Sequence, residues 1–450
     1  MSKGTVSGRT ASGGTTPSDE DTREEALIHL RRNYVAYLCH GLLGQTGMRL
    51  VNTPTFIPAY LYALSGSDIV VGLARSVQYL GMFLSPILSA TWVEHRLRVL
   101  PLAFWVGAAL RLQILGLALA AVVFPEPLVL AAVIGFLGLF GFFLGMQGVI
   151  FSTVFAKVIP VERRGVLLGI RNALSGLTAA AAAYCGGRYL VGDEVSETVV
   201  GSALREVFGN GFGATFGVAF VLTSVGLLML LFVREPRPER VRERKRVRDR
   251  LRDLPGLLRS DRAFTLYFSA RSLATMGRMA LPFYFLYASA HTGVDEGTSL
   301  GVISLAFLLA QTVSNAVWGW IADRSGFRLV FLAALVVWMV AGIALMPAEG
   351  LIGTSLAFAG IGVGMGGFVL ASQNMVLEFG EREELPMRIA VANSAAEFTG
   401  AIGPLLGGVL VAVGSYATVF WTAIGFQAAA VLVVLFFVDE PRNRARDVAN

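Results

Sequence analysis

The chain has 450 residues, of which 55% are hydrophobic and only 15% are charged, and its mean hydropathy is +0.64. A soluble domain usually carries about 25% charged residues, so this balance excludes an ordinary water-soluble globule. Cys39 and Cys185 are the two cysteines, which excludes a disulfide framework and a cysteine-based metal site. The formal charge of +6 does not predict nucleic-acid binding, because the basic residues gather between long apolar blocks.

The N-terminal segment, residues 1–33, starts with a stretch rich in Ser, Thr and Gly and contains no hydrophobic run. A signal peptide needs an apolar core, so we expect this segment to be a disordered cytoplasmic tail. Membrane insertion is then directed by the first apolar block.

Twelve apolar blocks follow, each about as long as the roughly 17 to 25 residues that a helix needs to cross the hydrocarbon of a bilayer. Backbone groups in lipid find no outside partner, so such blocks predict helices and an all-α integral membrane protein. The blocks are Tyr34–Tyr62, Ile69–Trp92, Val99–Phe124, Leu128–Ala156, Val166–Leu190, Gly211–Val233, Ala263–Ala290, Leu300–Ala322, Leu329–Met346, Leu351–Leu377, Ile389–Val413 and Thr418–Val438.

The distribution of Lys and Arg predicts the orientation. With a cytoplasmic N-terminus, the outer loops carry only Arg205, whereas the inner segments carry the basic linker 234–262 and the tail 439–450. The positive-inside rule therefore predicts a protein of the cell (inner) membrane with both termini in the cytoplasm. We interpret the linker as a solvated segment rather than as a site for nucleic acid or anionic lipid.

The linker divides the chain into two six-helix halves, residues 34–233 and 263–438, which share sparse matches in sequence. Gly72 aligns with Gly301 at one offset, and Gly187 aligns with Gly408 at another. Two such repeats are the arrangement of carriers whose substrate site lies midway across the membrane, between the halves.

One loop between two apolar blocks carries a motif that resembles a known family signature. The run Gly319–Arg328, GWIADRSGFR, resembles the G-x-x-A-D-R-x-G-x-R signature of the major facilitator superfamily. The resemblance implies the twelve-helix fold of that family, secondary active transport by alternating access, and gating contacts by Asp323, Arg324 and Arg328. The first-half counterpart departs from the pattern, with Glu94 in place of Asp, and is assigned to the same gate.

Two arginines, one in the first helix of each half, are candidates for substrate binding. Arg49 lies near the middle of the first block, on a helical face with Gln45 and Asn52, and Arg278 lies near the middle of the seventh. In the resembled family these helices line the central cavity, and carriers of organic anions or phosphates often hold the anion between two arginines. The alternative is structural, since Pro54 and Pro282 nearby would free carbonyls for an arginine to cap.

Further polar side chains at membrane depth are cavity candidates, although hydrogen bonds between helices explain each of them equally well. They are Gln147, Gln311, Asn315, Gln373 and Asn374. Glu397, the acid placed well inside a block, is a candidate for proton coupling or a structural ion-pair partner. His40 is a second coupling candidate, or a histidine that is simply hydrogen-bonded.

The sequence therefore predicts a secondary transporter of a small solute, with an organic or phosphorylated anion as the hypothesis and protons as a candidate coupling ion. The alternatives are a proton-driven exporter of drugs, siderophores or other amphipathic compounds, and a non-transporting receptor with a carrier fold. A membrane-embedded enzyme would need paired acids, a histidine cluster or a Ser/Lys or Cys/His arrangement at membrane depth, and the sequence has none of these and no ATP-binding motif. We therefore expect no enzyme and no cofactor. The expected partners are the substrate and the bilayer, with no nucleic acid, and we expect a monomer.

Overall fold

The computed structural model describes residues 27–93, 96, 98–192, 199–236, 261–379 and 385–438. Most of the predicted N-terminal tail, residues 237–260 of the linker, the C-terminal tail and Glu94 lie outside the described residues, so the predictions made for them are not addressed by the structure.

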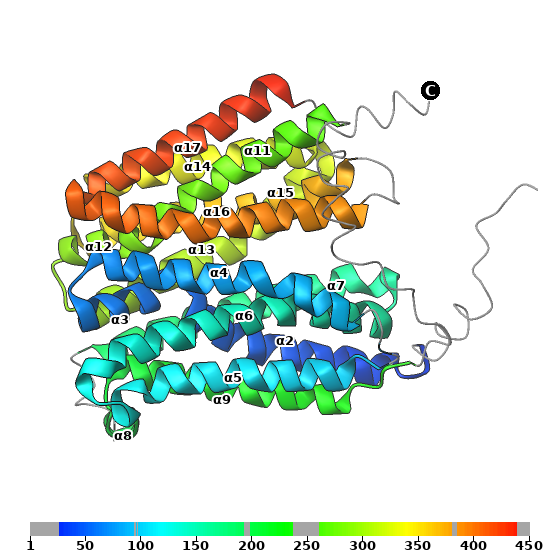
Figure 1. Ribbon diagram of the computed structural model, residues 1–450, viewed down its shortest axis with the longest axis horizontal. Helices are drawn as coiled ribbons and strands as arrows, with labels where there is room; N and C mark the ends of the chain where they lie inside the picture. The colour runs from blue at the N-terminus through cyan, green and yellow to red at the C-terminus, as the bar shows by residue number, and fades with distance from the viewer. Residues whose placement is uncertain are drawn as a thin grey trace, which may run out of the picture.

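The described chain is a bundle of helices without strands (Figure 1), which confirms the predicted all-α fold. The helices are α2 Leu30–Asn52, α3 Phe56–Ser65, α4 Asp68–Val93, α5 Leu100–Val123, α6 Glu126–Val158, α7 Val161–Cys185 continued by the π-helix η1 Gly186–Val191, α8 Val199–Phe208, α9 Gly211–Leu228 continued by the 3-10 turn η3 Met229–Phe232, α11 Arg262–Met276, the 3-10 turn η4 Gly277–Ala280, α12 Leu281–His291, α13 Glu296–Ser325, α14 Phe327–Leu345, α15 Gly350–Asn374 continued by η5 Met375–Glu378, α16 Leu385–Val413 and α17 Tyr416–Phe437.

Ten of the described helices are long and apolar enough to cross a membrane as single segments. The other two expected spans are the first and the seventh, and both are interrupted. The first breaks between Asn52 and Phe56, around Pro54, and the seventh passes through the 3-10 turn η4 before α12, which has Pro282 in its first turn. Proline lacks an N–H and restricts the residue before it, which accounts for a break at each place.

One helix was not expected from the sequence. The segment between the fifth and sixth spans, which holds no apolar block, contains the ten-residue helix α8. Its exposed residues include Val199, Val200 and Val207, so one apolar side remains uncovered by the protein. Arg205 ties it to the end of the fifth span by donating to the carbonyl of Leu190 at 2.7 Å.

The helices form two groups, α2–α9 below and α11–α17 above in Figure 1. Large aromatic side chains fill both groups, among them the fully buried Phe140 in the first and Phe283, Phe331 and Trp338 in the second. The groups meet where α4 runs along α16 and where α7 with η1 runs along α13. The interface between the halves is therefore formed by α4 and α7 of the first half and α13 and α16 of the second, and we call it the seam.

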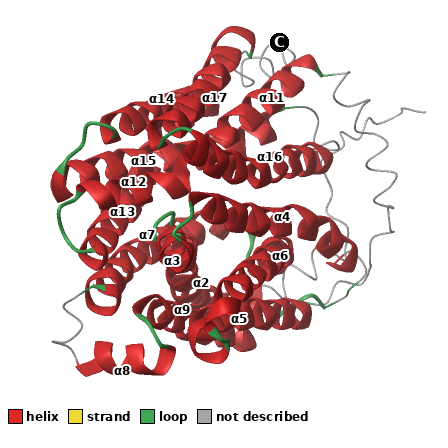
Figure 2. Cartoon of the chain, turned by 60° about the vertical axis from the view of Figure 1, so that its left-hand side comes forward, coloured by secondary structure: helices red, strands yellow, loops and turns green. Residues whose placement is uncertain are grey.

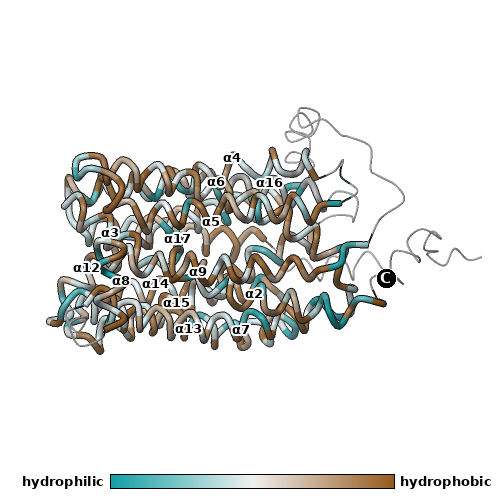
Figure 3. Tube along the Cα trace, turned by 90° about the horizontal axis from the view of Figure 1, so that it is seen from below, coloured by the Kyte–Doolittle hydropathy of each residue, from teal (hydrophilic) through white to brown (hydrophobic). Residues whose placement is uncertain are grey.

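The two ends of the bundle differ in polarity. In Figure 1, η3 and α17 end and α11 begins at the same end of the bundle, which we call the linker end, and the opposite end is called the distal end. Hydrophilic segments of the trace gather at the linker end, whereas the middle of the bundle is mostly apolar (Figure 3). This division follows the expectation for helices that pass through hydrocarbon.

The halves are tightly joined at the distal end. Gly72 of α4 lies against the backbone of Pro404 and Gly408 in α16, and Gly187 of η1 lies against the backbone of Gly301 in α13. A β-carbon at any of these glycines would collide with the facing helix, so glycine permits the close approach.

Toward the linker end the halves separate. The last ring contact across α4 and α16 joins Phe83 and Phe398, with centroids 5.6 Å apart. Beyond it α4 and α16 diverge, as Figure 2 shows. The structure is thus closed at the distal end and parted at the linker end.

Candidate functional site

Arg49 lies at the meeting point of three helices. It sits one turn before the end of α2 and donates from Nη1 to Oγ1 of Thr312 in α13 at 3.3 Å. Gly176 of α7 faces Thr312 so closely that a larger residue would not fit. One turn earlier on α2, Gln45 accepts a hydrogen bond of 2.8 Å from Ser175 of α7. Arg49 therefore reaches across the seam from the first half to the second.

Asn52, the last residue of α2, starts a chain of polar contacts into α4. Its side-chain oxygen accepts from Nε2 of Gln78 at 3.0 Å, and Oε1 of Gln78 accepts from Nη1 of Arg75 at 2.7 Å. Gln78 and Arg75 are buried, with 1% and 4% of their surface exposed. The break after Asn52 thus lies beside a buried arginine that the sequence analysis left out of the candidate set.

Arg278, in the 3-10 turn η4, binds across the seam. Its Nη2 donates to the hydroxyl of Tyr79 in α4 at 3.0 Å, and its guanidinium carbon lies 4.8 Å from the centre of the Tyr79 ring. Glu397 of α16 interacts electrostatically with both of these residues, and its Oε2 is buried without a hydrogen-bond partner among the described residues. Mid-membrane polar groups of three helices therefore gather at Tyr79.

The two predicted substrate arginines bind different partners. Arg49 contacts Thr312 and Arg278 contacts Tyr79, so no contact in the structure joins the pair. Neither hydrogen bond goes to a carbonyl freed by a helix break, which was the structural alternative. A substrate role for the pair stays a prediction, and the structure adds a second arginine, Arg75, to the surroundings of Arg278.

The remaining amide candidates lie apart from one another. Gln147 accepts from Nη1 of Arg111 at 2.6 Å, inside the first half, where Arg111 also binds two backbone carbonyls. Gln311 and Asn315 flank Gly366 of α15. The contact of Gln147 with Arg111 is a hydrogen bond between helices of one half, which was the alternative to a role in substrate binding.

The two amide candidates in α15, Gln373 and Asn374, have different surroundings. Gln373 is exposed, whereas the side-chain nitrogen of Asn374 donates to the carbonyl of Leu370 one turn before it, at 2.8 Å. The structure therefore does not bring all amide candidates into one site, and their substrate role stays a prediction.

His40 is enclosed between α2 and α9. Its Nδ1 lies 2.8 Å from the carbonyl oxygen of Gly226, and the rings of Tyr37 and Phe151 lie against it. A ring nitrogen at this distance from a carbonyl carries the proton and donates it. This is the hydrogen-bonded arrangement that was the alternative to a coupling role.

The gating motif lies at the linker end of α13 and α14. Arg324 stacks on the ring of Trp320, with its guanidinium carbon 3.9 Å from the ring centre, and Arg328 donates to the carbonyls of Val434 and Leu435 at the end of α17. A cation at the C-terminus of a helix is favourable because the last carbonyls are unpaired and partly negative. Arg328 thus holds α17 within the second half; the gating roles of these residues and of Asp323 stay predictions.

Two ion pairs at the linker end were not foreseen. Glu235, beyond the sixth span, accepts from the backbone N–H groups of Val99 and Leu100 at the start of α5 and binds Lys157 at 3.2 Å. An acid at the N-terminus of a helix is a recognisable signal, but the acid here comes from more than a hundred residues away and leaves no local pattern.

The second pair joins Asp261, which caps α11, to Arg388 of α16 at 2.5 Å. Burial by itself raises the pKa of the Asp261 carboxyl, but hydrogen bonds from the N–H of Phe264 and from Arg388 outweigh it and hold that pKa below its usual range. The carboxylate is therefore charged and paired at neutral pH.

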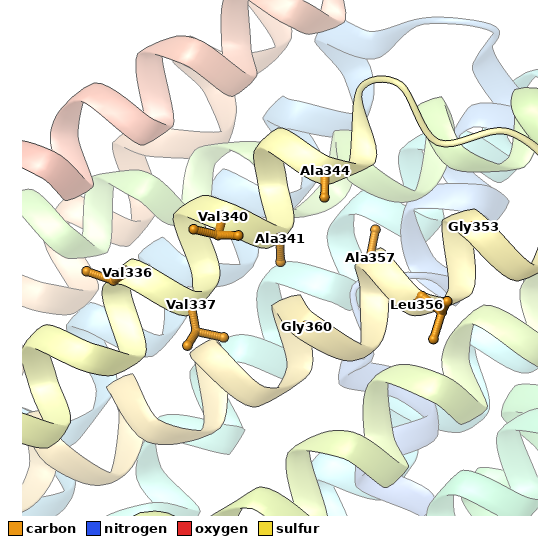
Figure 4. Close-up of a pocket in the computed structure, with 9 residues that line it drawn as sticks. All are labelled: Val336, Val337, Val340, Ala341, Ala344, Gly353, Leu356, Ala357 and Gly360. Atoms are coloured by element: carbon orange, nitrogen blue, oxygen red, sulfur yellow. The ribbon is translucent and has the colours of Figure 1, made fainter.

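An apolar groove of about 400 Å³ lies between α14 and α15 (Figure 4). Valine, alanine, leucine and glycine side chains line it, including Val336, Leu356 and Gly360. It lacks the polar groups that orient a solute, and none of the candidate residues lines it. Among the described residues no group of three His, Cys, Asp or Glu side chains is placed to hold a metal ion.

Comparisons with known proteins place this geometry in a family. The model of the Major Facilitator Superfamily matches residues 38–295 and 267–449. Citrate exporter 1 of Aspergillus niger is 25% identical over 142 residues, which cover 30% of this chain and 27% of that protein. The chain therefore matches about a quarter of the length of this curated relative.

Solved structures share the fold over nearly the whole chain. A mutant of the nucleoside transporter NupG has a TM-score of 0.66 and 12% identity, covering 91% of this chain and 99% of that one. A D-xylose-proton symporter has a TM-score of 0.67 and 12% identity, covering 92% and 99%. With the family model matching both halves, the chain belongs to the major facilitator superfamily, whose members are multi-pass membrane transporters and not enzymes.

Proposed function

We propose that this transporter moves a small organic or phosphorylated anion across the cytoplasmic membrane by alternating access. The observation that carries the proposal is the imbalance of charge at membrane depth. Seven arginines lie within the spans. Among the acidic residues of the described helices, Glu397 is the one that lies outside the first and last turns. The seven are Arg49, Arg75, Arg111, Arg171, Arg188, Arg271 and Arg278.

The partners of these arginines support an anionic solute. Arg49, Arg75 and Arg278 bind hydroxyl and amide oxygens, and among the described residues none of them has a carboxylate within ion-pair distance. A cation buried in a membrane without an opposite charge is costly, at about 2.5 to 3.5 kcal/mol on the insertion scale. An anion that enters the seam would supply the missing charge, and the planar guanidinium is suited to carboxylate or phosphate oxygens.

The relative adds weak support in the same direction. Citrate exporter 1 is named for an organic anion, although it resembles this chain over a short stretch only.

The conformation supports alternating access. The halves touch at the distal end and part at the linker end, as one state of a carrier that rocks about a central site requires. With the linker in the cytoplasm, as the distribution of Lys and Arg predicts, the structure is the inward-facing state.

The test is solute flux in proteoliposomes, with radiolabelled citrate and glycerol 3-phosphate as the first probes. We expect Arg49→Gln and Arg278→Gln each to lower uptake at least tenfold, because a hydrogen bond to a charged group contributes about 1.5 to 3 kcal/mol. Arg31→Gln, at an exposed position of the linker end, removes the same charge outside the spans and serves as the control. Uptake that is unchanged when both mid-membrane arginines are replaced contradicts the assignment.

A second candidate function is proton-driven export of amphipathic compounds, which Glu397 favours. Its carboxyl is partly buried, and Oε2 has no hydrogen-bond partner among the described residues. The D-xylose-proton symporter is a proton-coupled protein of the same fold. Export that depends on a pH gradient and is lost in Glu397→Gln supports this function, whereas ligand binding without any flux identifies a receptor.

A further inference from the structure

The hydroxyl of Tyr79 lies between two guanidinium groups that come from opposite halves. Arg75, one turn before Tyr79 on α4, directs Nη2 to this oxygen at 3.5 Å, and Arg278 of η4 directs Nη2 to it at 3.0 Å. Both guanidinium carbons also lie over the phenol ring, at 5.5 and 4.8 Å from its centre. We call Arg75, Tyr79 and Arg278 the Tyr79 cluster. Two cations thus converge on one neutral acceptor.

Some hydrogen-bond donors of this cluster have no acceptor among the described residues. Nε of Arg75 and Nε of Arg278 are both buried and lack a hydrogen-bond partner among the described residues. A guanidinium offers five N–H groups in a fixed fork, and a phenol oxygen accepts at two positions only. A buried donor without a partner costs about 1 to 3 kcal/mol, so the cluster in this state is incompletely satisfied.

Glu397 does not complete it. The carboxyl of Glu397 interacts electrostatically with Arg278 and Tyr79, but its Oε2 has no hydrogen-bond partner in the described chain. It is therefore near enough to compensate part of the charge, without occupying the donors of the arginines.

The cluster lies at the boundary between the closed and the parted ends of the seam. Next to Arg75 the Oγ of Ser76 accepts from the backbone N–H of Leu405 at 3.0 Å, so α4 and α16 are in direct contact at this level. Toward the linker end, beyond the contact of Phe83 with Phe398, α4 and α16 diverge (Figure 2). Arg278 itself is only partly buried. A solute that enters from the linker end reaches the cluster where the seam closes.

We propose that Arg75 and Arg278 form a two-sided clamp for an anionic group with two oxygens, carboxylate or phosphate, and that the hydroxyl of Tyr79 holds the place of that group when the carrier is empty. The inference rests on the proposed anion transport and names the arginine that faces Arg278 in the site. Anion binding moves both guanidinium groups from the phenol to the anion. Because one arginine belongs to each half, the bound anion also draws the halves together at the cluster.

The clamp predicts opposite effects for two substitutions. Arg75→Gln removes half of the clamp and should weaken anion binding about 10- to 100-fold, the range expected for a hydrogen bond between charged groups. Tyr79→Phe removes the competing acceptor and should strengthen binding about 2- to 10-fold, because the empty site then loses the hydrogen bonds that the hydroxyl accepts from the two guanidinium groups. Arg75→Lys, which keeps the charge but not the fork, should lie between Arg75→Gln and the unaltered protein.

The assay is isothermal titration of citrate and of glycerol 3-phosphate into the purified full-length protein in detergent, with melting temperatures to confirm folding. Arg271→Gln is the matched control. Arg271 is a buried arginine of the same span as Arg278, but it donates to Asn393 at 2.8 Å and does not reach Tyr79. We expect this control to change the dissociation constant by less than about threefold.

The outcomes separate the two proposals. If the unaltered protein binds neither anion, the proposed function fails and the clamp with it. If it binds one of them and Arg75→Gln binds equally well, the clamp alone is overturned. Binding that is weaker in a folded Tyr79→Phe variant also overturns it, because the hydroxyl would then be a ligand or a structural tie and not a substitute for the anion.

Discussion

Closure of the distal end depends on glycines that have no room for a methyl group. A β-carbon at Gly408 of α16 would lie 2.7 Å from the carbonyl oxygen of Asp68, and one at Gly187 of η1 would lie 2.5 Å from the Cα of Gly301. The obstacles are backbone atoms, which a side-chain rotation cannot remove. Gly408→Ala and Gly187→Ala are therefore expected to shift the carrier away from the distal-closed state.

The magnitude follows from the distances. An ordinary Cβ contact is 3.4 Å or longer, so the facing helices must separate by about 0.7 Å at Gly408 and by more than about 0.9 Å at Gly187, where the amide nitrogen of Gly301 is closer still than its Cα. Overpacking of this kind typically costs about 1 to 3 kcal/mol, which reduces the ratio of distal-closed to distal-open protein about 5- to 150-fold. Gain in helix propensity from glycine to alanine, about 1 kcal/mol, acts on both states alike.

The assay is alkylation of a cysteine placed inside the distal contact. Ser304 is fully buried there and hydrogen-bonded to Thr55 at 2.7 Å, so Ser304→Cys, in a variant without the native cysteines, reports distal opening. A membrane-impermeant maleimide should react faster in Gly408→Ala and Gly187→Ala by up to the factor given above. Gly169→Ala is the control, because a β-carbon at Gly169 of α7 meets nothing within 4 Å.

Alkylation at position 304 that proceeds at the rate of the unaltered background, in variants that are both folded, contradicts a collision at these glycines. The collision is also contradicted if Gly169→Ala accelerates the reaction as much as they do, since helix propensity would then be the cause.

Two further predictions concern the ion pairs of the linker end. Asp261→Asn keeps a capping residue on α11 but removes the charge that pairs with Arg388. Because the folded-state pKa of Asp261 is lowered, its contribution to stability is present above the unfolded pKa and is lost as the pH falls through the folded value. The melting temperature of Asp261→Asn should therefore be lower than that of the unaltered protein at pH 7, and the difference should shrink below about pH 4. Glu235→Gln should lower the free energy of unfolding by about 1 to 3 kcal/mol, measured by thermal unfolding. The buried carboxylate accepts hydrogen bonds from two backbone N–H groups and pairs with Lys157, whereas the amide that replaces it has one acceptor oxygen. An unchanged melting temperature contradicts this prediction.

The helices and their interruptions were predictable because lipid imposes a simple rule. A long apolar block must be a helix, and Pro54 and Pro282 indicated where the first and seventh spans would deviate. The repeat was also informative, beyond its sparse matches. Gly187 aligns with Gly408, and the structure places both at the distal seam, one at each crossing of the halves.

The partners of the polar residues were not predictable in the same way. Tyr79 lies in an apolar block, where an aromatic residue is expected as part of the packing, and nothing in the sequence marks its hydroxyl as an acceptor. Helical periodicity gives the face of α4 on which Arg75 lies but not the helix that faces it. Gln147 shows the converse, since a plausible cavity residue turned out to bind Arg111 of its own half.

The kinds of contact within and between the halves differ, and this difference bears on transport. The ion pairs Lys157–Glu235 and Asp261–Arg388 each lie inside one half. Across the seam the contacts of the described residues include hydrogen bonds with at most one charged partner, such as that of Arg278 with Tyr79, close glycine packing, and the ring contact of Phe83 with Phe398.

A charged pair that spans the seam would cost several kcal/mol to separate in a dry interior, whereas a hydrogen bond to a hydroxyl exchanges for water or solute at a net cost of about 1.5 to 3 kcal/mol. Each half can therefore move as a unit while the seam opens and closes. An anion that replaces the hydroxyl of Tyr79 would for a time supply the missing charged contact, which explains how binding of the solute favours the change of state that carries it across.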